Sequence, residues 1–419
     1  MRTVGIVVEY NPFHNGHYYH VQQSRKITGA DAVVAVMSGH FLQRGEPALL
    51  DKWTRAEMAL RGGCDLVLEL PVAYSTQSAE WFARGAVAVL DATGVVDTLC
   101  FGSESGDIDS FCAAADILRE EPAAFKQALH DRLAEGVPYP SAYEWALSAH
   151  AAEQGIPPLA VAQPNNSLGL HYTLAIKRLG SAITPYTIRR EKSGYNDQKP
   201  SDESIASATA IRKLLLEAGD LNAARPFVPS TTLALMQRER DNGLAAVDWR
   251  LFEKQLLHAI LTRSIEELGD IHEMTEGLEH RLLHTLRQLD EVRFEPLLEH
   301  LKTKRYTRTK LQRALLAVLL GHKKNELTPA KLADGPGYIR VLGFTSKGQS
   351  LLKTMRTAAR WPILTSAAGA PEQLPFLPLD IRATAVYALA RNSNAAARDL
   401  LRDYYEQPIR ISLEDADSV

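Results

Sequence analysis

The 419-residue sequence contains few cysteines, no long apolar run and no excess of positive charge. Its three cysteines are Cys64, Cys100 and Cys112, and none belongs to a C-x-x-C pair. This small, odd number suits a reducing compartment and argues against a disulfide framework or a cysteine-based zinc site. No apolar stretch reaches the roughly 18 residues of a membrane span, and no signal-peptide cleavage site follows residues 1–8. We therefore expect a cytoplasmic protein without membrane contact.

The balance of charged and apolar residues is that of a globular protein. Acidic residues number 50 and basic residues 47, so the formal net charge is −3 and no global positive field attracts nucleic acid. Any RNA-binding site must therefore be a local patch. Apolar residues make up 45% of the chain, which is enough to build cores, and the length predicts two or three domains.

Strand-like and helix-like segments alternate in the first half of the chain. Short runs rich in β-branched residues predict strands at residues 4–8, 32–37, 66–70, 98–101 and 183–188. Helical periodicity predicts helices at residues 17–28, 51–61, 79–90, over much of 107–180, and at 207–218. Buried strands separated by amphipathic helices are typical of α/β proteins with a doubly wound parallel sheet.

The pattern changes after Pro226 and Pro229. Residues 231–321 have helical periodicity and almost no strand signal, and the tail mixes short apolar runs with helices. We therefore predict an α/β domain at residues 1–225 followed by a mainly α-helical C-terminal region at residues 226–419.

A candidate phosphate site follows the first predicted strand, which ends at Glu9. His14-Asn15-Gly16-His17 then opens a helix, and ligands of open α/β sheets bind at the carboxyl ends of strands. A helix N-terminus offers free N–H groups to phosphate, Gly16 allows a close approach, and both imidazoles can donate hydrogen bonds. The alternative is that His14 and His17 are ordinary loop histidines.

His14-x-Gly16-His17 after a first strand resembles the signature of the nucleotidyltransferase superfamily, whose members attack the α-phosphate of ATP and release pyrophosphate. Residues 206–212, with the sequence Ala-Ser-Ala-Thr-Ala-Ile-Arg, resemble its second motif, although alanine stands where isoleucine is common. The resemblance implies that Ser207 caps a helix while Thr209 and Arg212 face the β- and γ-phosphates. Helix capping alone is the alternative role of Ser207. A Lys-Met-Ser-Lys-Ser motif is absent, which disfavours an aminoacyl-tRNA synthetase.

Longer blocks resemble one family within that superfamily, the bacterial tRNA(Met) cytidine acetate ligases. The matching blocks are residues 5–17, 37–47, 101–104, 164–169 and 340–344. The resemblance implies a Rossmann-like nucleotidyltransferase domain that activates acetate with ATP to form acetyl-adenylate. It also implies N4-acetylation of the wobble cytidine of elongator tRNA(Met), with Mg²⁺ bridging the phosphates of ATP.

The family also implies which residues form the site. The catalytic residues implied by the resemblance are His14, His17, Ser207, Thr209 and Arg212. The implied ATP-binding residues are Val7, Val8, Glu9, Tyr10, Asn11, Pro12, Phe13, His14, Asn15, Gly16, His17, Tyr18, Tyr19, His20, Gly102, Asn165 and Arg190. Asn166 and Arg189 are the adjacent alternatives to Asn165 and Arg190, and turn chemistry is the alternative role for such polar loop residues.

Charged residues also follow the second predicted strand. We hypothesise that Lys52 or Arg55 contacts an ATP phosphate or the acetate carboxylate. The alternative is the start of a surface helix with an Asp51–Arg55 pair at i,i+4 spacing.

A basic segment in the second half is the candidate RNA site. Between Lys302 and Lys324 there are eight lysines and arginines and no acidic residue. The predicted tRNA-binding residues are Lys302, Lys304, Arg305, Tyr306, Arg308 and Lys310. Tyr306 is expected to stack on an unpaired base, and helical spacing places Lys304, Arg308 and Gln312 on one face. The alternative is a solvated helix face.

Two other functions fit parts of the pattern. One is nucleotidyl transfer onto a small phosphate ester or mononucleotide, and the other is a non-catalytic RNA-binding module. The long helical half with its basic segment favours a macromolecular acceptor.

Overall fold

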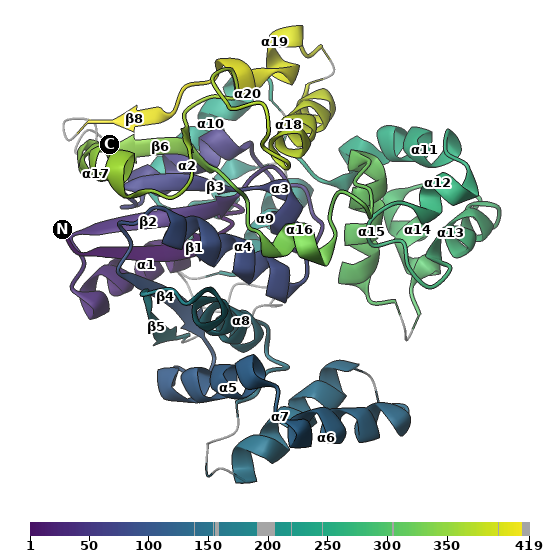
Figure 1. Cartoon of the computed structure of the whole chain (residues 1–419). Coiled ribbons are helices and arrows are strands. Elements are labelled where there is room, and N and C mark those ends of the chain that lie inside the picture. Colours follow the sequence, from purple (N-terminus) through teal and green to yellow (C-terminus); the bar gives the residue numbers. More distant parts are fainter. Residues whose placement is uncertain are drawn as a thin grey trace.

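The computed structural model describes residues 1–137, 139–153, 155, 159–190, 206–218, 220–244, 246–303, 306–392 and 394–412. Figure 1 shows a twisted sheet with helices on both faces, a helical body beside it (α11–α15) and a helical hairpin below it (α6 and α7). Among the helices of these residues, none combines the length and apolar composition needed to cross a membrane.

The strands form one sheet in the order β5-β4-β1-β2-β3-β6-β7, with β8 beside β6. Their bounds are β1 Thr3–Val8, β2 Ala32–Ser38, β3 Leu66–Leu70, β4 Thr98–Ser103, β5 Thr184–Arg189, β6 Ile339–Thr345, β7 Ile363–Leu364 and β8 Ile409–Ile411. Strands β1 to β5 run parallel to one another, whereas β6 pairs antiparallel with β3. Every residue of β2 and β3 is buried, as expected for strands covered on both faces.

The helices of the first half are α1 Asn15–Thr28, α2 Lys52–Arg61, α3 Val72–Ser75, α4 Ala79–Ala92, α5 Ile108–Glu120, α6 Ala123–Ala134, α7 Tyr139–Glu153, α8 Pro164–Leu179 and α9 Ala208–Ala218. The later ones are η1 Leu221–Ala224, α10 Ser230–Asp241, η2 Trp249–Phe252, α11 Glu253–Leu261, α12 Ile265–Gly269, α13 Leu278–Leu286, α14 Phe294–Leu301, α15 Arg308–Leu320, α16 Pro329–Ala333, α17 Ser346–Ala358, α18 Leu377–Arg391, α19 Ala397–Leu400 and α20 Arg402–Tyr405.

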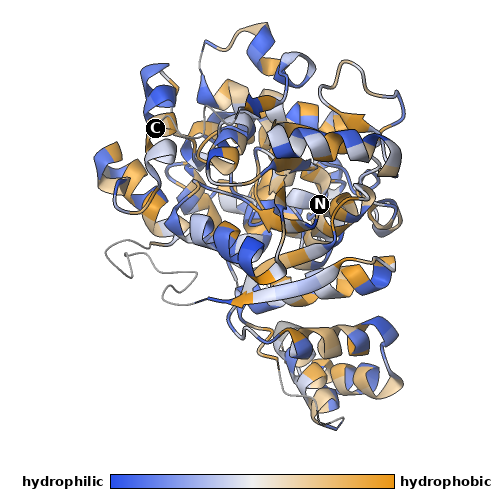
Figure 2. Cartoon of the chain, turned by 90° about the vertical axis from the view of Figure 1, so that its left-hand side faces the viewer, coloured by the Kyte–Doolittle hydropathy of each residue, from blue (hydrophilic) through white to orange (hydrophobic). Residues whose placement is uncertain are grey.

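The two faces of the sheet have separate apolar cores. Alternate residues of β2, such as Val34 and Val36, pack with α4 and α8, while Val33 and Ala35 pack with α1, α2 and α9. This alternation follows from the two-residue period of a strand. Figure 2 shows apolar and polar turns alternating along most helices, which is typical of helices that bury one side.

The order of the strands determines where a ligand can bind. The chain passes from β1 to β2 and β3 on one side of β1 and then returns to β4 and β5 on the other side. Such a reversal leaves a crevice at the carboxyl ends of the two strands where the order changes, here β1 and β4. The loop after β1 and the end of β4 therefore meet at the place where a nucleotide is expected.

The predicted α/β fold with a doubly wound parallel sheet is confirmed, and the five predicted strands match β1 to β5. The C-terminal half is mainly helical, but it adds β6, β7 and β8 to the same sheet. The proposed domain boundary between residues 225 and 226 stays a prediction. Strands from both sides of this boundary lie in the same sheet.

At Gly45, the backbone of the helical body comes very close to the backbone of the part that contains the sheet, which we call the sheet domain (β1 to β8 and the helices that cover them). Gly45 lies in the β2–α2 loop (residues 39–51), and a Cβ placed there would lie 2.5 Å from the backbone nitrogen of Arg313 in α15. Because backbone atoms of a packed helix cannot move cheaply, glycine is required at this contact.

We expect Gly45→Ala to lower the free energy of unfolding by about 1–3 kcal/mol more than a positive φ alone explains. Gly243→Ala is the matched control, since Gly243 has φ +73°, close to the +75° of Gly45, but no neighbour within 4 Å. Urea unfolding of both variants gives the comparison. Equal losses of unfolding free energy in the two variants would show that the added Cβ meets no steric penalty at Arg313.

Candidate active site

The loop between β1 and α1 carries two histidines that cap the helix for each other. His14 is the N-cap residue, and its Nδ1 accepts a hydrogen bond from the Gly16 backbone N–H at 3.0 Å. The backbone N–H of His14 in turn donates to Nδ1 of His17 at 3.3 Å. This is the reciprocal arrangement of a capping box, with imidazoles in place of the usual Ser and Glu. We call His14 and His17 the imidazole capping box.

Glycine is required at position 16 for a local reason. A Cβ on Gly16 would lie 2.9 Å from Cε1 of the His14 ring. The sequence suggested that Gly16 lets a ligand approach closely, but here the nearest group is the capping imidazole itself. Gly16 thus makes room for the ring that caps the helix.

The hydrogen bonds fix the proton positions of the imidazole capping box. Because both Nδ1 atoms accept, each neutral ring carries its proton on Nε2. Burial and the positive charges of Arg190 and Arg212 lower the pKa of His14 to about 3. Burial lowers the pKa of His20 to about 4 and that of His17 well below its usual range. At neutral pH these histidines are therefore neutral.

The two rings of the imidazole capping box stack with their centroids 3.7 Å apart. His14 is 8% exposed, and its Nε2 has no hydrogen-bond partner among the described residues. This Nε2–H is therefore a preorganised, neutral donor at the helix N-terminus, where a phosphate oxygen is also attracted by the helix dipole.

Several residues of the predicted ATP loop are buried and shape it. Asn11 Oδ1 accepts a hydrogen bond from the Leu49 backbone at 2.7 Å, and the Asn15 amide donates to the Pro226 carbonyl at 3.0 Å. The Phe13 ring fills the space above Gly62. The other loop positions differ in exposure: Val8, Tyr10 and Pro12 are buried, Val7 and Glu9 are half-buried, and Tyr18 and Tyr19 are exposed on α1.

The second motif lies beside this loop although it follows about 190 residues later in the chain. Ser207 caps α9, since its Oγ accepts from the Ala210 backbone at 3.1 Å. Arg212 donates to the Asn11 carbonyl at 3.1 Å, to Glu46 at 3.3 Å and to Thr209 Oγ1 at 3.4 Å. The structure thus brings Arg212 to the capping box, while Ser207 acts as a helix cap.

Gly102 and Arg190 lie at the ends of β4 and β5 and contact each other. A Cβ on Gly102 would meet Cγ of Arg190 at 3.4 Å, and the charge of Arg190 lowers the pKa of His14. Arg189 instead lies against Gly106, where a Cβ would be 2.6 Å from its own Cβ. Of the two adjacent arginines, Arg190 is the one that faces the capping box.

The two asparagines at the start of α8 have different roles. Asn166 is 2% exposed, and its Oδ1 accepts from the backbones of Glu104 and Ser105 at 3.0 and 3.1 Å. Its amide also donates to the Ala160 carbonyl, so Asn166 is fully engaged within the protein. Asn165 is half-buried, and its amide donates to Glu104 at 2.7 Å. Asn165 is therefore the more available of the two.

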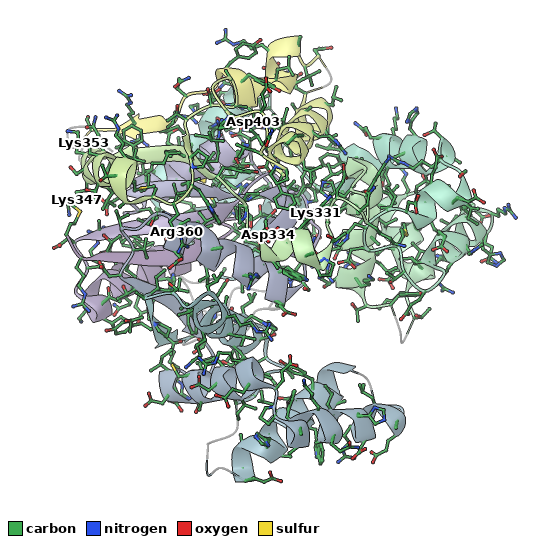
Figure 3. All side chains as sticks on the ribbon, in the orientation of Figure 1. Lys331, Asp334, Lys347, Lys353, Arg360 and Asp403 are labelled. Carbon is green, nitrogen blue, oxygen red and sulfur yellow. The ribbon has the colours of Figure 1, made fainter. Side chains whose placement is uncertain are left out.

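The hypothesis that Lys52 or Arg55 contacts a substrate is wrong. Both side chains are completely buried. Lys52 Nζ lies 2.8 Å from both Glu69 and Asp403, and Asp403 points inward from α20 (Figure 3). Arg55 donates to backbone carbonyls after β1 and β2, at Glu9 and Ser38. The expected Asp51–Arg55 surface pair is also wrong, since Asp51 pairs with Arg391 and Arg402.

The expected stacking of Tyr306 on a base is also wrong. Tyr306 is 7% exposed, and its hydroxyl donates to the Glu276 carbonyl at 2.8 Å. Its ring belongs to the apolar core of the helical body, with α14 and α15. A base cannot stack on a ring that is already covered.

The basic residues around Tyr306 are largely paired with acidic residues. The ion pairs join Lys302 to Glu299, Arg308 to Glu295 and Glu299, and Lys310 to Glu273. These acidic partners precede the basic segment in the sequence, which is why the run alone looked uncompensated. Lys304 and Arg305 lie outside the described residues. Contact of this segment with tRNA stays a prediction.

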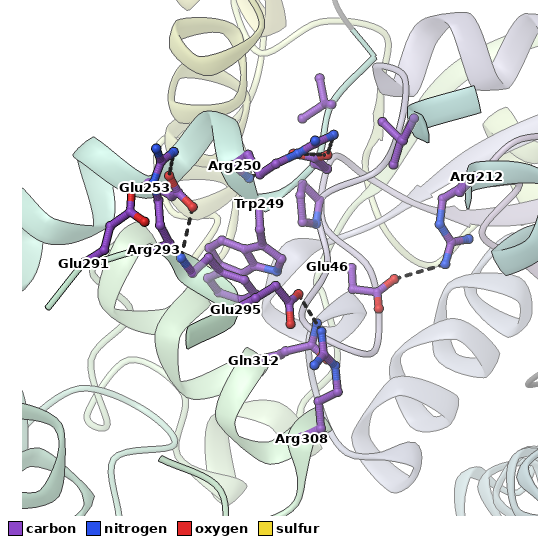
Figure 4. A pocket seen from close by; sticks show the side chains of 15 residues that line it. Glu46, Arg212, Trp249, Arg250, Glu253, Glu291, Arg293, Glu295, Arg308 and Gln312 are labelled. Carbon is purple, nitrogen blue, oxygen red and sulfur yellow. Dashed lines mark hydrogen bonds and ion pairs between the residues drawn. The ribbon is translucent and has the colours of Figure 1, made fainter. Parts of the chain in front are cut away.

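A cavity for which the sequence carries no signal opens beside Arg212. It has a volume of about 490 Å³ and lies between the sheet domain and the helical body (Figure 4). Its lining comes from five separate parts of the chain: residues 46–47, 212–216, 247–253, 291–295 and 308–312. Because these parts meet only in the folded protein, no local motif could have predicted the cavity.

The chain is similar to known proteins over nearly its whole length. A family model described as HIGH Nucleotidyl Transferase matches residues 1–403. The tRNA(Met) cytidine acetate ligase of Lysinibacillus sphaericus is 39% identical over 410 residues, which cover 98% of this chain and 100% of that protein. The protein of the same name from Bacillus velezensis is 41% identical over 412 residues, covering 98% and 97%.

Two solved structures are also similar. The crystal structure of Thermotoga maritima TmcAL in its apo form has a TM-score of 0.91 and 36% identity, covering 98% of this chain and 100% of that one. The structure of the same protein bound with alpha-thio ATP has a TM-score of 0.89 with the same identity and coverage.

Proposed function

The chain belongs to the HIGH nucleotidyl transferases and, among them, to the family of tRNA(Met) cytidine acetate ligases, and we propose that its imidazole capping box, Arg190 and Arg212 form the site of acetyl-adenylate formation. The chain uses ATP to activate acetate, releasing pyrophosphate, and then acetylates N4 of the wobble cytidine of elongator tRNA(Met). The observation that carries the assignment of the site is the convergence of these four side chains at the crevice between β1 and β4.

In the first step an acetate oxygen attacks the α-phosphorus of ATP, and the bond to the pyrophosphate oxygen breaks. Negative charge grows on the phosphate oxygens, and the Nε2–H of His14 donates to them without changing its own charge. His17 supports His14 through stacking and the shared cap. Arg190 and Arg212 supply positive charge from the two sides of the loop.

The nucleoside of ATP is assigned to the β4 side of the crevice. Gly102 leaves the end of β4 open beside Arg190, and the half-buried Asn165 offers its amide from the start of α8. Val7, Val8 and the backbone of the β1–α1 loop form the floor. Thr209 holds Arg212 in place through its hydroxyl.

We assign Mg²⁺ to this site as a companion of ATP. Among the described residues no three histidine, cysteine or acidic side chains converge as a metal site. Glu46, which is held by Arg212, is the carboxylate beside the capping loop that suits a water of a phosphate-bound ion. When bound, Mg²⁺ neutralises charge on the β- and γ-phosphates.

In the second step N4 of the wobble cytidine attacks the acetyl carbonyl of the adenylate. The new C–N bond replaces the bond to the phosphate oxygen, AMP leaves, and the amine loses a proton. An anticodon-loop base is already unpaired, so bringing it to the adenylate costs little. A cytoplasmic location, where ATP and tRNA meet, belongs to the same proposal.

Pyrophosphate exchange tests the proposed first step. Purified protein is expected to exchange labelled pyrophosphate into ATP only when acetate is present, because exchange needs a reversible acetyl-adenylate. Transfer of labelled acetate to unmodified elongator tRNA(Met) is the companion measurement, with the initiator tRNA as control. Exchange that proceeds without acetate, or that needs a phosphate ester instead, would assign the site to another nucleotidyl transfer.

A further inference from the structure

The cavity between the sheet domain and the helical body shares a wall with the proposed ATP site. Arg212 lines the cavity, and the same guanidinium donates to the Asn11 carbonyl of the capping loop and to Glu46. Figure 4 shows Glu46 and Arg212 on one side of this space and Trp249 and Gln312 across it. A molecule in the cavity would therefore lie next to the reacting phosphate.

The strand order places this cavity on the acceptor side of the site. Most residues assigned to ATP follow β1, β4 and β5, whereas Pro47 of the cavity belongs to the loop that follows β2. Arg212 and Glu46 belong to both the proposed ATP site and the cavity wall. Strand β2 lies on the opposite side of β1 from β4. ATP and the occupant of the cavity can therefore approach the capping box from different sides, which leaves a nucleophile free to reach the activated acetyl group.

Two polar side chains in the wall of the cavity lack partners. Gln312 is 3% exposed and lines the cavity; its amide is open to the cavity and has no hydrogen-bond partner among the described residues. Trp249 is 7% exposed, and its indole Nε1–H is likewise without a partner in the described part of the chain. Buried polar groups are normally satisfied, so unpaired ones that line a cavity point to a ligand. Together they offer two donors and one acceptor.

The Trp249 donor is held rigidly. Its ring stacks on Phe294 with centroids 4.2 Å apart and an interplanar angle of 7°, and both rings lie in the wall. A cavity with a flat aromatic wall and a few fixed polar groups suits a nucleobase. The Watson–Crick edge of cytosine offers two acceptors, O2 and N3, and one donor, N4–H, which complements the donors and acceptor of the wall.

Arginines at the mouth of the cavity suit an RNA backbone. Arg250, Arg293 and Arg308 each line it with exposed side chains and pair with Asp248, Glu253 and Glu295, and of these three acids Glu295 is the exposed one. The exposed pair of Arg308 and Glu295 is worth little, so a phosphate can replace this carboxylate at small cost. Five acidic side chains and four arginines line the cavity, so its lining has a formal charge of −1, which suits an uncharged base.

From this geometry we infer that the cavity is the binding site of the acceptor pyrimidine, with Gln312 and Trp249 reading its Watson–Crick edge and the arginines at the mouth holding the flanking phosphates. The inference rests on the proposed function, because it takes tRNA as the acceptor. Of the side chains it names, Gln312 and Arg308 lie in the predicted basic segment, whereas Trp249, Arg250 and Arg293 lie outside it.

Binding of synthetic anticodon stem-loops tests the inference. One stem-loop carries cytidine at the wobble position and the other an abasic nucleotide there, and both are titrated against the wild type, Gln312→Leu and Trp249→Phe. Trp249→Phe keeps an aromatic ring on Phe294 and removes the N–H donor together with part of the indole. Gln288→Leu and Trp145→Phe are matched controls, since both side chains are exposed and do not line the cavity.

Each cavity variant is expected to bind the cytidine stem-loop about tenfold more weakly than the wild type, as for loss of a buried hydrogen bond, and the abasic stem-loop equally well. Equal weakening of both stem-loops, or none, would overturn the inference. A higher Kd for ATP in Gln312→Leu would assign the cavity to ATP instead and overturn it too. The proposed function has a separate readout, which is acetylation of whole tRNA(Met) by the wild type.

Discussion

Replacing His14 with asparagine is expected to lower the rate of acetate-dependent pyrophosphate exchange by a factor of about 10²–10³ while leaving the free energy of unfolding nearly unchanged. Asparagine is a good N-cap residue and can replace the bond from Gly16, but its short amide does not reach the position of Nε2. The change therefore removes the donor and keeps the helix cap. Exchange kinetics and urea unfolding measure the two effects separately.

His14→Ala is the companion variant, because it removes both the donor and the cap. We expect the same loss of rate and an additional loss of about 1 kcal/mol in unfolding free energy. If asparagine retained the wild-type rate, the capping role of His14 would explain its presence and the catalytic assignment would be wrong. If asparagine destabilised the protein as much as alanine, the lost rate could not be assigned to the donor.

The lowered pKa of His14 also predicts how pH affects stability and the rate of pyrophosphate exchange. With a folded pKa of about 3 against an ordinary value of 6.5, the unfolded chain binds the proton more readily than the folded one between these values. Stability due to this group therefore rises as pH increases through that window and levels off above 6.5. His14→Asn should therefore lose less unfolding free energy than the wild type when the pH is lowered below 6.5. In the wild type, the rate of pyrophosphate exchange should show no step near pH 6.5 from titration of His14.

The part of the site that could be predicted is the part encoded locally. A strand, a capping box and a helix within residues 3–28 place His14 and His17 at a helix N-terminus, and the spacing of the two histidines is itself the spacing of N-cap and N3. The runs that form β1 to β5 are likewise local, because a buried parallel strand needs only a short apolar segment.

Residues whose role depends on distant partners could not be interpreted from the sequence. Lys52 looked like a free cation because its partner Asp403 lies 351 residues later. Tyr306 looked like a stacking ring because the basic residues around it give no sign that its ring packs into the apolar core or that its hydroxyl bonds to Glu276, 30 residues earlier. Strand β6 was missed because its Arg340, which pairs with Asp403, interrupts the apolar run.

Lys52→Met is expected to lower the free energy of unfolding by about 3–5 kcal/mol, a large part of the ~5–15 kcal/mol of a typical protein. Burial opposes the charge of Lys52, but Asp403 and Glu69 outweigh it, and the net effect raises the pKa of Lys52. Without the ammonium group, the buried Glu69 loses its cation, and Asp403 keeps Arg340, at 3.5 Å. Chemical denaturation at neutral pH measures the loss, with the exposed Lys26→Met as the matched control, expected within about 0.5 kcal/mol of the wild type.

A second substitution separates lost pairing from lost packing at Lys52. Adding Asp403→Asn to Lys52→Met removes one of the two carboxylates that faced Lys52. The double variant should therefore lose less unfolding free energy than the sum of the losses of the two single variants. At a temperature where Lys52→Met is still folded, its KM for acetate should match that of the wild type, because Lys52 is sealed from solvent between α2, β3 and α20. A variant of normal stability that had lost acetate activation would instead place Lys52 at the substrate, and the buried ion pairs would not be its function.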